Sequence, residues 1–182
     1  MFKPKAHAIL GTTKGGRRMK IGLRRQTLVG LLVLVALALP MRAAAADQVP
    51  FKAAETGTFQ LLSPCETSGI VVDVTGSGHA THLGDFTTHY RECFVPATGA
   101  VTNGSFTLTA ANGDMVFGTY GGQVSPTGDS NVFSYEDPGV ITGGTGRFAG
   151  ASGIVDTSGV VNLATGEYGG TITGSVSNPA SA

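Results

Sequence analysis

Apolar side chains after residue 46 recur with a period of two, and no helical apolar stripe longer than two turns is found there. The alternation runs through residues 70–75, 106–110 and 168–176. A period of two places successive side chains on opposite faces of a strand, whereas an amphipathic helix needs a period near 3.6. Threonine and aromatic residues, which suit a pleated and half-buried surface, occupy many of these positions. The pattern predicts an all-β chain.

Short polar segments that contain glycine separate the alternating runs. Asn112-Gly113 is the strongest hairpin signal, because a type I′ turn needs positive φ at both central residues. Short connections favour antiparallel neighbours, and eight strands in so short a chain favour a closed barrel, with a sandwich as the alternative. Glycines within the runs suit bulges and tight barrel corners. The expected strands cover residues 55–62, 69–75, 80–94, 101–111, 114–124, 131–142, 151–161 and 168–176.

The first 46 residues differ in composition from the rest of the chain. They contain nine of the 12 Lys and Arg residues and no Asp or Glu. A basic stretch precedes an apolar run at residues 28–39, and an alanine-rich segment follows. This order predicts a signal peptide at 1–46, with Met19 as an alternative start, cleavage before Asp47 and a secreted or periplasmic product. An uncleaved membrane anchor is the competing interpretation, although 12 apolar residues span only about 18 Å as a helix.

The remainder of the chain is acidic. Residues 47–182 contain three Lys and Arg residues against 12 Asp and Glu residues, a net charge of −9. Such a charge argues against binding to nucleic acid or docking on anionic lipid, both of which need a basic face. We therefore expect a barrel domain at 47–177, a flexible tail at 178–182, no nucleic-acid partner and no stable membrane anchor after cleavage.

Cys65 and Cys93 are the two cysteines of the chain. An even number of cysteines in an exported protein indicates a disulfide, and two cysteines allow one pairing. The sequence predicts a Cys65–Cys93 bond, with two reduced and half-buried thiols as the alternative. Their spacing is far from that of a zinc knuckle.

A glycine-rich stretch carries a resemblance to known families. Residues 141–153, Ile-Thr-Gly-Gly-Thr-Gly-Arg-Phe-Ala-Gly-Ala-Ser-Gly, resemble the turn after a strand in the allene oxide cyclase and dirigent proteins. With the pieces at 78–84 and 110–114, the chain also looks like a group of uncharacterised secreted bacterial proteins. The resemblance implies an eight-stranded barrel and a homo-oligomer, since the plant families are often trimeric. Residues 55–75 do not match the catalytic constellation of the cyclases.

The same turn has a structural interpretation. Its glycines permit positive φ or close approach of the backbone, and its aromatic residue is large enough to fold under one barrel end and plug it. The spacing matches neither a dinucleotide-binding nor a P-loop motif, so a phosphate-binding loop is the less favoured alternative. Arg147 is expected to pair with a carboxylate such as Glu136 or Asp137. The residues assigned to this turn are Gly143, Gly144, Gly146 and Phe148.

The expected strand at 80–94 offers candidates for a ligand pocket. Its aromatic face is expected to point inward, unless a bulge at Gly84 exchanges the two faces. An apolar lumen with a few polar groups is the usual form of a small-ligand pocket, and a filled lumen with polar rims is the alternative. His82 and Glu92 would lie about 33 Å apart on a straight strand, at its opposite ends. The pocket candidates are His82, Phe86, Tyr90 and Glu92.

Sequence signals for chemistry are few. There is no G-x-S-x-G nucleophile motif and no calcium-loop spacing. His79 and His82 face opposite sides of a straight strand, so neither a metal nor a cofactor is predicted. We expect an exported barrel of non-catalytic role. The alternatives are binding of a small apolar ligand in the lumen, or a cofactor-free cyclase or isomerase like the allene oxide cyclases.

Overall fold

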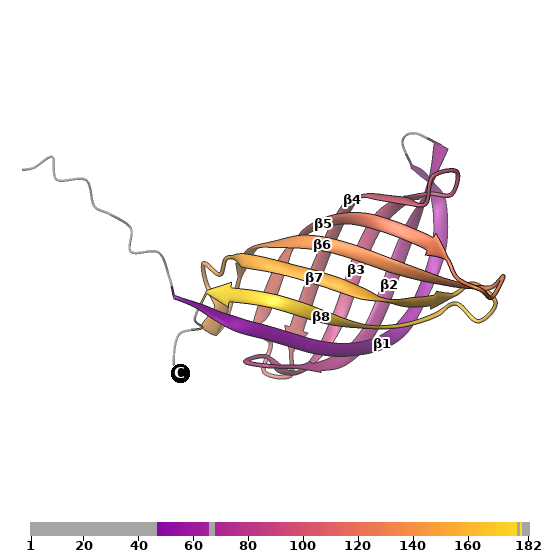
Figure 1. Ribbon diagram of the computed structural model, residues 1–182. Coiled ribbons are helices and arrows are strands. Elements are labelled where there is room, and N and C mark those ends of the chain that lie inside the picture. Colours follow the sequence, from indigo (N-terminus) through magenta and orange to yellow (C-terminus); the bar gives the residue numbers. More distant parts are fainter. Residues whose placement is uncertain (1–46, 66–67, 178, 180–182) are drawn as a thin grey trace, which may run out of the picture. The chain divides into compact units, whose positions relative to one another are not determined.

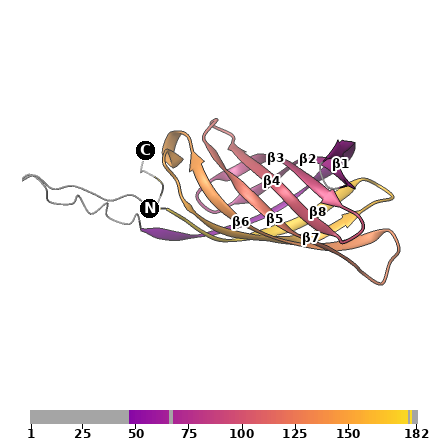
Figure 2. The same ribbon diagram turned by 90° about the horizontal axis from the view of Figure 1, so that it is seen from above.

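The computed structural model describes residues 47–65, 68–177 and 179, and its eight strands form one closed barrel (Figure 1). Each strand is antiparallel to its sequence neighbours, and β8 pairs with β1 to close the ring (Figures 1 and 2). The predicted all-β barrel is confirmed, and the sandwich alternative is wrong because the sheet has no open edge. The strands are β1 (Gln48–Cys65), β2 (Gly69–Ala80), β3 (Gly84–Val95), β4 (Ala100–Ala110), β5 (Met115–Pro126), β6 (Val132–Gly144), β7 (Gly153–Asn162) and β8 (Glu167–Ser177).

The first strand begins earlier than the sequence pattern predicts, at Gln48 and not at residue 55. Its early part closes the barrel by pairing with the end of β8, where Gln48 lies opposite Ser177. On its other side, the Lys52 nitrogen donates to the Thr81 hydroxyl at 2.9 Å, and the Thr81 nitrogen donates to the Lys52 carbonyl at 2.8 Å. The expected signal peptide lies outside the described residues, as does the expected tail apart from Pro179.

The two ends of the barrel differ. At one end, here called the plugged end, the β6–β7 connection contains a short 3₁₀ turn, η2 (Gly146–Phe148). Phe148 is 1% exposed and belongs to a core cluster with Leu83, Ala151 and Val176. The opposite end, called the open end, carries the β1–β2, β3–β4, β5–β6 and β7–β8 connections (Figure 1).

The glycines of the β6–β7 connection have different roles. Gly146 has a φ of +58°, in the left-handed region that favours glycine. Gly143 and Gly144 are not among the positive-φ residues, so close approach is the reason for them. A Cβ on Gly144 would lie 2.5 Å from the carbonyl oxygens of both Met115 and Phe148. The backbone at Gly144 therefore has no space for a side chain.

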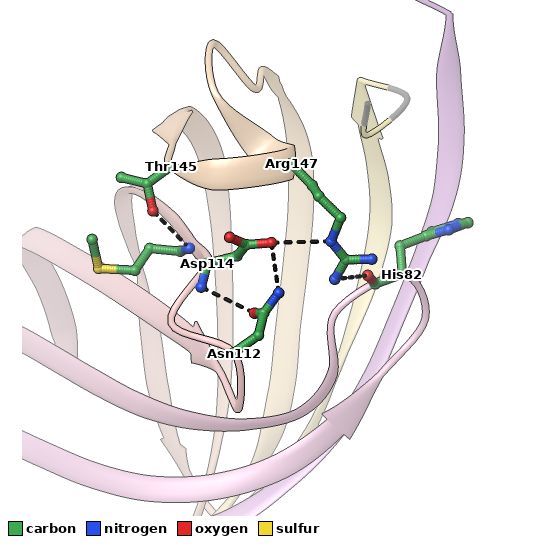
Figure 3. A network of polar contacts seen from close by, with 6 residues as sticks. His82, Asn112, Asp114, Thr145 and Arg147 are labelled. Carbon is green, nitrogen blue, oxygen red and sulfur yellow. Dashed lines mark hydrogen bonds and ion pairs between the residues drawn. The ribbon is translucent and has the colours of Figure 1, made fainter. Parts of the chain in front are cut away.

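Arg147 ties this connection to two other hairpins at the plugged end (Figure 3). Its Nε donates to Asp114 Oδ2 at 3.0 Å, and an η nitrogen donates to the His82 carbonyl at 3.4 Å. The expected pairing of Arg147 with Glu136 or Asp137 is wrong, because Asp114 in the β4–β5 turn lies beside the guanidinium. Asn112 donates to the same Asp114 carboxylate and accepts from the Asp114 nitrogen.

The predicted disulfide is confirmed. Cys65 at the end of β1 is bonded to Cys93 in β3, with 6.0 Å between their Cα atoms. The bond crosses β2 beside Gly69, where a Cβ would lie 2.6 Å from the Cys93 sulfur. A loop of 28 residues closed in this way stabilises the fold by about 3.5 kcal/mol in the chain-entropy description. Such bonds persist in oxidising compartments, which a secreted or periplasmic location would provide.

Candidate functional site

A cavity of about 80 Å³ lies inside the barrel, and residues from all eight strands line it. Toward the plugged end its lining side chains are fully buried, as Phe51, Leu108 and Val116 illustrate. Toward the open end the lining side chains of Phe59 and Val161 are only half-buried. The cavity is therefore closed toward the plugged end and accessible from the open end.

Glycines on neighbouring strands leave space for large aromatic rings inside the barrel, so a cavity remains between the rings. A Cβ on Gly104 would lie 2.8 Å from the ring of Tyr120, and one on Gly57 would lie 2.7 Å from the ring of Tyr168. The rings therefore occupy space beside wall positions that have no side chain. Interior glycine thus leaves room for aromatic side chains, and Gly104 and Gly118 also border register shifts of the kind expected from the sequence.

Most polar groups of the cavity are carboxyl groups or phenols. All four tyrosines of the chain line it, together with three carboxylic acids and Thr157. No Lys, Arg or His is among the described residues that line it. The rest of the lining is Val, Leu, Ile and Phe, so seven acidic or phenolic groups face an otherwise apolar space. They are Glu55, Tyr90, Glu92, Tyr120, Tyr135, Asp137 and Tyr168.

Two of the carboxyl groups are hydrogen-bonded to tyrosines. The Tyr90 hydroxyl donates to Glu55 Oε1 at 2.7 Å, and the Tyr120 hydroxyl donates to Glu92 Oε2 at 2.5 Å. The two phenol rings meet edge to face, with centroids 5.8 Å apart. Phe106 packs beside both rings, with centroid distances of 6.4 and 6.5 Å. These contacts hold the two carboxyl–phenol pairs next to each other on the cavity wall.

Other polar atoms of the cavity have no hydrogen-bond partner among the described residues. They are Glu55 Oε2, Asp137 Oδ1 and the hydroxyls of Tyr135 and Tyr168. Glu55 is 3% exposed, and the two tyrosines are 8% exposed. Buried polar atoms are nearly always paired, and leaving one unpaired costs about 1–3 kcal/mol. Four polar atoms therefore face the cavity without compensation from the described residues.

Burial shifts the titration of all three carboxyl groups in the same direction. It raises the pKa of Glu55 to about 7, although the Tyr90 hydrogen bond acts in the opposite direction. Burial, and then the charge of Glu92, raise the pKa of Asp137 to about 7, and burial also raises the pKa of Glu92. The pKa of Tyr135 is raised by burial and then by the charges of Glu55, Asp137 and Glu92. Neutral pH is therefore close to the pKa of Glu55 and of Asp137, while the phenols stay protonated.

The four sequence-predicted pocket residues lie in different places. Tyr90 and Glu92 line the cavity. Phe86 points inward and is buried in the core cluster, outside the cavity lining. The placement of His82 on the inner face is wrong, because His82 lies exposed in the β2–β3 turn with a φ of +65°. The strand begins at Gly84, so the alternation of β3 does not reach His82.

Sequence reasoning missed five of the seven polar groups. Glu55 shares the parity of Phe51, Ala53 and Phe59 in β1, which is a signal for an inward carboxylate. Tyr168 shares the parity of Ile172 in β8. Each signal is local, whereas the meeting of these groups depends on closure of the barrel. The missed residues are Glu55, Tyr120, Tyr135, Asp137 and Tyr168.

A comparison with models of protein families finds no match to this chain, and a comparison with curated proteins finds none either. Within the described ranges, no helix is long and apolar enough to cross a membrane. The described residues also contain no group of three or more His, Cys, Asp or Glu side chains placed to hold a metal ion.

Proposed function

We propose that this chain is an exported barrel that binds a small, mainly apolar molecule in its lumen through a few polar atoms. The observation that carries the proposal is the set of four buried and unpartnered polar atoms in an otherwise apolar cavity. Apolar walls with a few convergent polar groups are the usual form of a small-molecule site. A merely structural lumen would be filled with paired or apolar side chains.

The size of the cavity limits the ligand. Pockets for drug-sized molecules are about 300–1,000 Å³, and the lumen has about 80 Å³. A ligand of a few heavy atoms fits within the barrel as it stands. A longer one would extend through the open end, past half-buried side chains such as Phe59 and Val124.

Tyrosine fluorescence offers a direct test. The chain has no tryptophan and all four tyrosines line the cavity, so its emission reports on the lumen. Small molecules extracted from the protein of the native host, followed by short alcohols and amines, would be titrated while emission is recorded. We expect a saturable change in emission.

Two adjacent residues provide matched variants for this test. Val161 lines the cavity, and Val160 is 48% exposed on the outer face of the same strand. Val161→Phe should fill the lumen and abolish binding, whereas Val160→Phe should leave it unchanged. Absence of a saturable change with every compound, or equal binding by both variants, would refute the proposal.

Proton transfer on the bound molecule is the second candidate function. A pKa of about 7 for Glu55 and for Asp137 suits a general acid or base at neutral pH. This supports the cofactor-free isomerase or cyclase implied by the resemblance to allene oxide cyclases. The co-purified molecule, incubated with the protein in D₂O, should then incorporate deuterium at carbon, and Glu55→Gln should abolish the incorporation.

The homo-oligomer implied by the same resemblance remains a prediction. Size-exclusion chromatography with light scattering of the chain from Asp47 onward would determine its mass in solution. A mass of three chains would support the resemblance to the plant families, and a mass of one chain would argue against it.

A further inference from the structure

Given the proposed lumen site, we infer that its ligand is a small organic cation, such as a primary amine with a short hydrocarbon body. The juxtaposition of three carboxyl groups, four phenols and an apolar wall, without Lys, Arg or His among the described lining residues, points to this class. The inference rests on the proposed function and adds the charge of the ligand.

The described residues that line the cavity include acidic side chains but no cationic ones. Glu55 comes from β1, Glu92 from β3 and Asp137 from β6, so three strands each direct a carboxyl group to the same space. Buried carboxylates are normally paired with a cation. The three cationic side chains after residue 46, Lys52, Arg91 and Arg147, are not among the lining residues. A bound cation would therefore supply the missing counter-charge.

The unpartnered atoms match the hydrogen-bonding capacity of an ammonium group. Glu55 Oε1 accepts from Tyr90, and its other oxygen, Oε2, has no donor. Asp137 Oδ1 also has no donor. An ammonium group has three donors and no acceptor, so it can satisfy both carboxylate oxygens and one of the two phenol oxygens of Tyr135 and Tyr168. A neutral carbonyl ligand could use the phenol donors but would leave ionised carboxylates unpaired.

The aromatic lining adds a second attraction for a cation. The faces of Tyr, Phe and Trp rings carry partial negative charge and attract cations within about 6 Å. Tyr90, Tyr120 and Phe106 form one contact group on the wall of the cavity. The aliphatic side chains that complete the lining would contact the hydrocarbon part of the ligand.

A metal ion suits the site less well than an organic cation. No three of the described His, Cys, Asp and Glu side chains are close enough together to hold one metal ion. A metal ion would also make no use of the apolar part of the cavity. The volume of about 80 Å³ favours an amine with few carbons.

Three probes of nearly equal size and different charge test the inference. They are n-butylammonium, n-butanol and butyrate, each titrated at pH 8 into the chain from Asp47 onward with tyrosine emission as the readout. We expect n-butylammonium to bind at least tenfold more tightly than n-butanol, and butyrate not to bind.

Proton competition provides an independent readout. Glu55, Glu92 and Asp137 line the cavity together with Tyr90, Tyr120, Tyr135 and Tyr168. Among these groups, Glu55 and Asp137 have a pKa of about 7 and so change charge between pH 5 and 8. Since ionised carboxyl groups attract the cation, the affinity for n-butylammonium should rise severalfold or more across this range. The affinity for n-butanol should stay constant or fall.

Variants that remove the charge of a carboxyl group but keep its size test whether charge causes the preference for the cation. Glu55→Gln keeps the size of the side chain and should reduce the preference for n-butylammonium over n-butanol about tenfold, and Asp137→Asn should act in the same direction. Glu136→Gln, next to Asp137 on the exposed face of β6, is the matched control and should keep the preference. If Glu55→Gln does not fold, Asp137→Asn carries the test.

The outcomes distinguish the two proposals. Equal or tighter binding of n-butanol or butyrate, abolished by Val161→Phe, would overturn the cation and leave the lumen site intact. A preference for n-butylammonium that persists in both carboxyl variants would also overturn the inference. Failure of all three probes and of host extracts to bind would overturn the proposed function itself.

Discussion

Glu55 is 3% exposed, and one of the two oxygens of its carboxyl group is unpartnered among the described residues. Ionisation of such a group is costly, because the charge loses its hydration and finds no cation in exchange. The Tyr90 hydrogen bond offsets part of this cost. The folded barrel therefore holds the proton of Glu55 more tightly than the unfolded chain does, and the difference links stability to pH.

The first prediction concerns this link. The pKa of Glu55 is about 7 in the folded protein against an ordinary value of 4.5, so its stabilising contribution is full below pH 4.5 and is lost as the pH rises through 7. The loss is on the order of 3 kcal/mol for a shift of this size. The melting temperature of the ligand-free protein should therefore be lower at pH 8 than at pH 5. Glu55→Gln should weaken this dependence and leave the part that comes from the raised pKa of Asp137.

Circular dichroism melts at pH 5, 6, 7 and 8 would measure the effect. Glu136→Gln, which removes an exposed carboxyl group from β6, should keep the slope of the native protein. The lowered pKa of Asp114, caused mainly by its hydrogen bond from Arg147, acts below its ordinary value of 3.8 and so outside this range. An equal or higher melting temperature at pH 8 would contradict the prediction.

At the scale of elements, the strands place aromatic rings over glycines of their neighbours. A Cβ on Gly118 of β5 would lie 2.7 Å from the ring of Phe106 in β4. The alternation in the sequence predicted the strands and the inward aromatic face of β3, because both depend on residues close together in the chain. The pairing of ring and glycine, and the meeting of Glu55 with Tyr90, depend on register between strands. The register between strands that are far apart in the sequence cannot be predicted from the alternation within each strand.

The plug at the β6–β7 connection leads to the second prediction. Phe148 is 1% exposed, so Phe148→Ala should leave a cavity and cost about 3–5 kcal/mol, which corresponds to roughly 10 °C or more in melting temperature. Arg147→Ala removes the bond to Asp114 at the surface and should cost much less. Thermal melts of the two variants would compare them, and equal losses would show that the ring is not the structural part of this turn.

Two adjacent glycines of the same connection provide the third prediction. A Cβ on Gly144 would meet the backbone oxygens of Met115 and Phe148 at 2.5 Å, and both oxygens accept backbone hydrogen bonds that a shift would break. A Cβ on Gly143 would meet only the Phe117 ring, whose side chain is partly exposed and can turn outward. Gly144→Ala should therefore lower the melting temperature clearly more than Gly143→Ala. The reverse order would contradict this account of the turn.

At the scale of the whole molecule, the structural features lie toward the two ends of the barrel and the proposed binding site lies between them. The plugged end contains Phe148 and the polar network of Arg147, Asp114 and Asn112. The Cys65–Cys93 bond joins β1 to β3 where they approach the open end. The carboxyl groups and phenols lie along the lumen between these two structural features. Changes in the plug should therefore alter stability first, and changes in the lumen should alter binding first.

The last prediction concerns where the mature chain begins. β1 starts at Gln48, which pairs with Ser177, and Phe51 three residues later is buried in the core cluster. Cleavage before Asp47 would leave every strand complete, whereas loss of a few more residues would remove the β1–β8 pairs that close the barrel. Intact-mass measurement of the protein from its native host should give a chain that begins near Asp47.

A chain starting at Asp47 should also melt cooperatively, and one starting at Ala54 should lose most of its stability, because it lacks Phe51 and the first β1–β8 pairs. Recovery of the native protein from the cytosol with residues 1–46 still attached would contradict export.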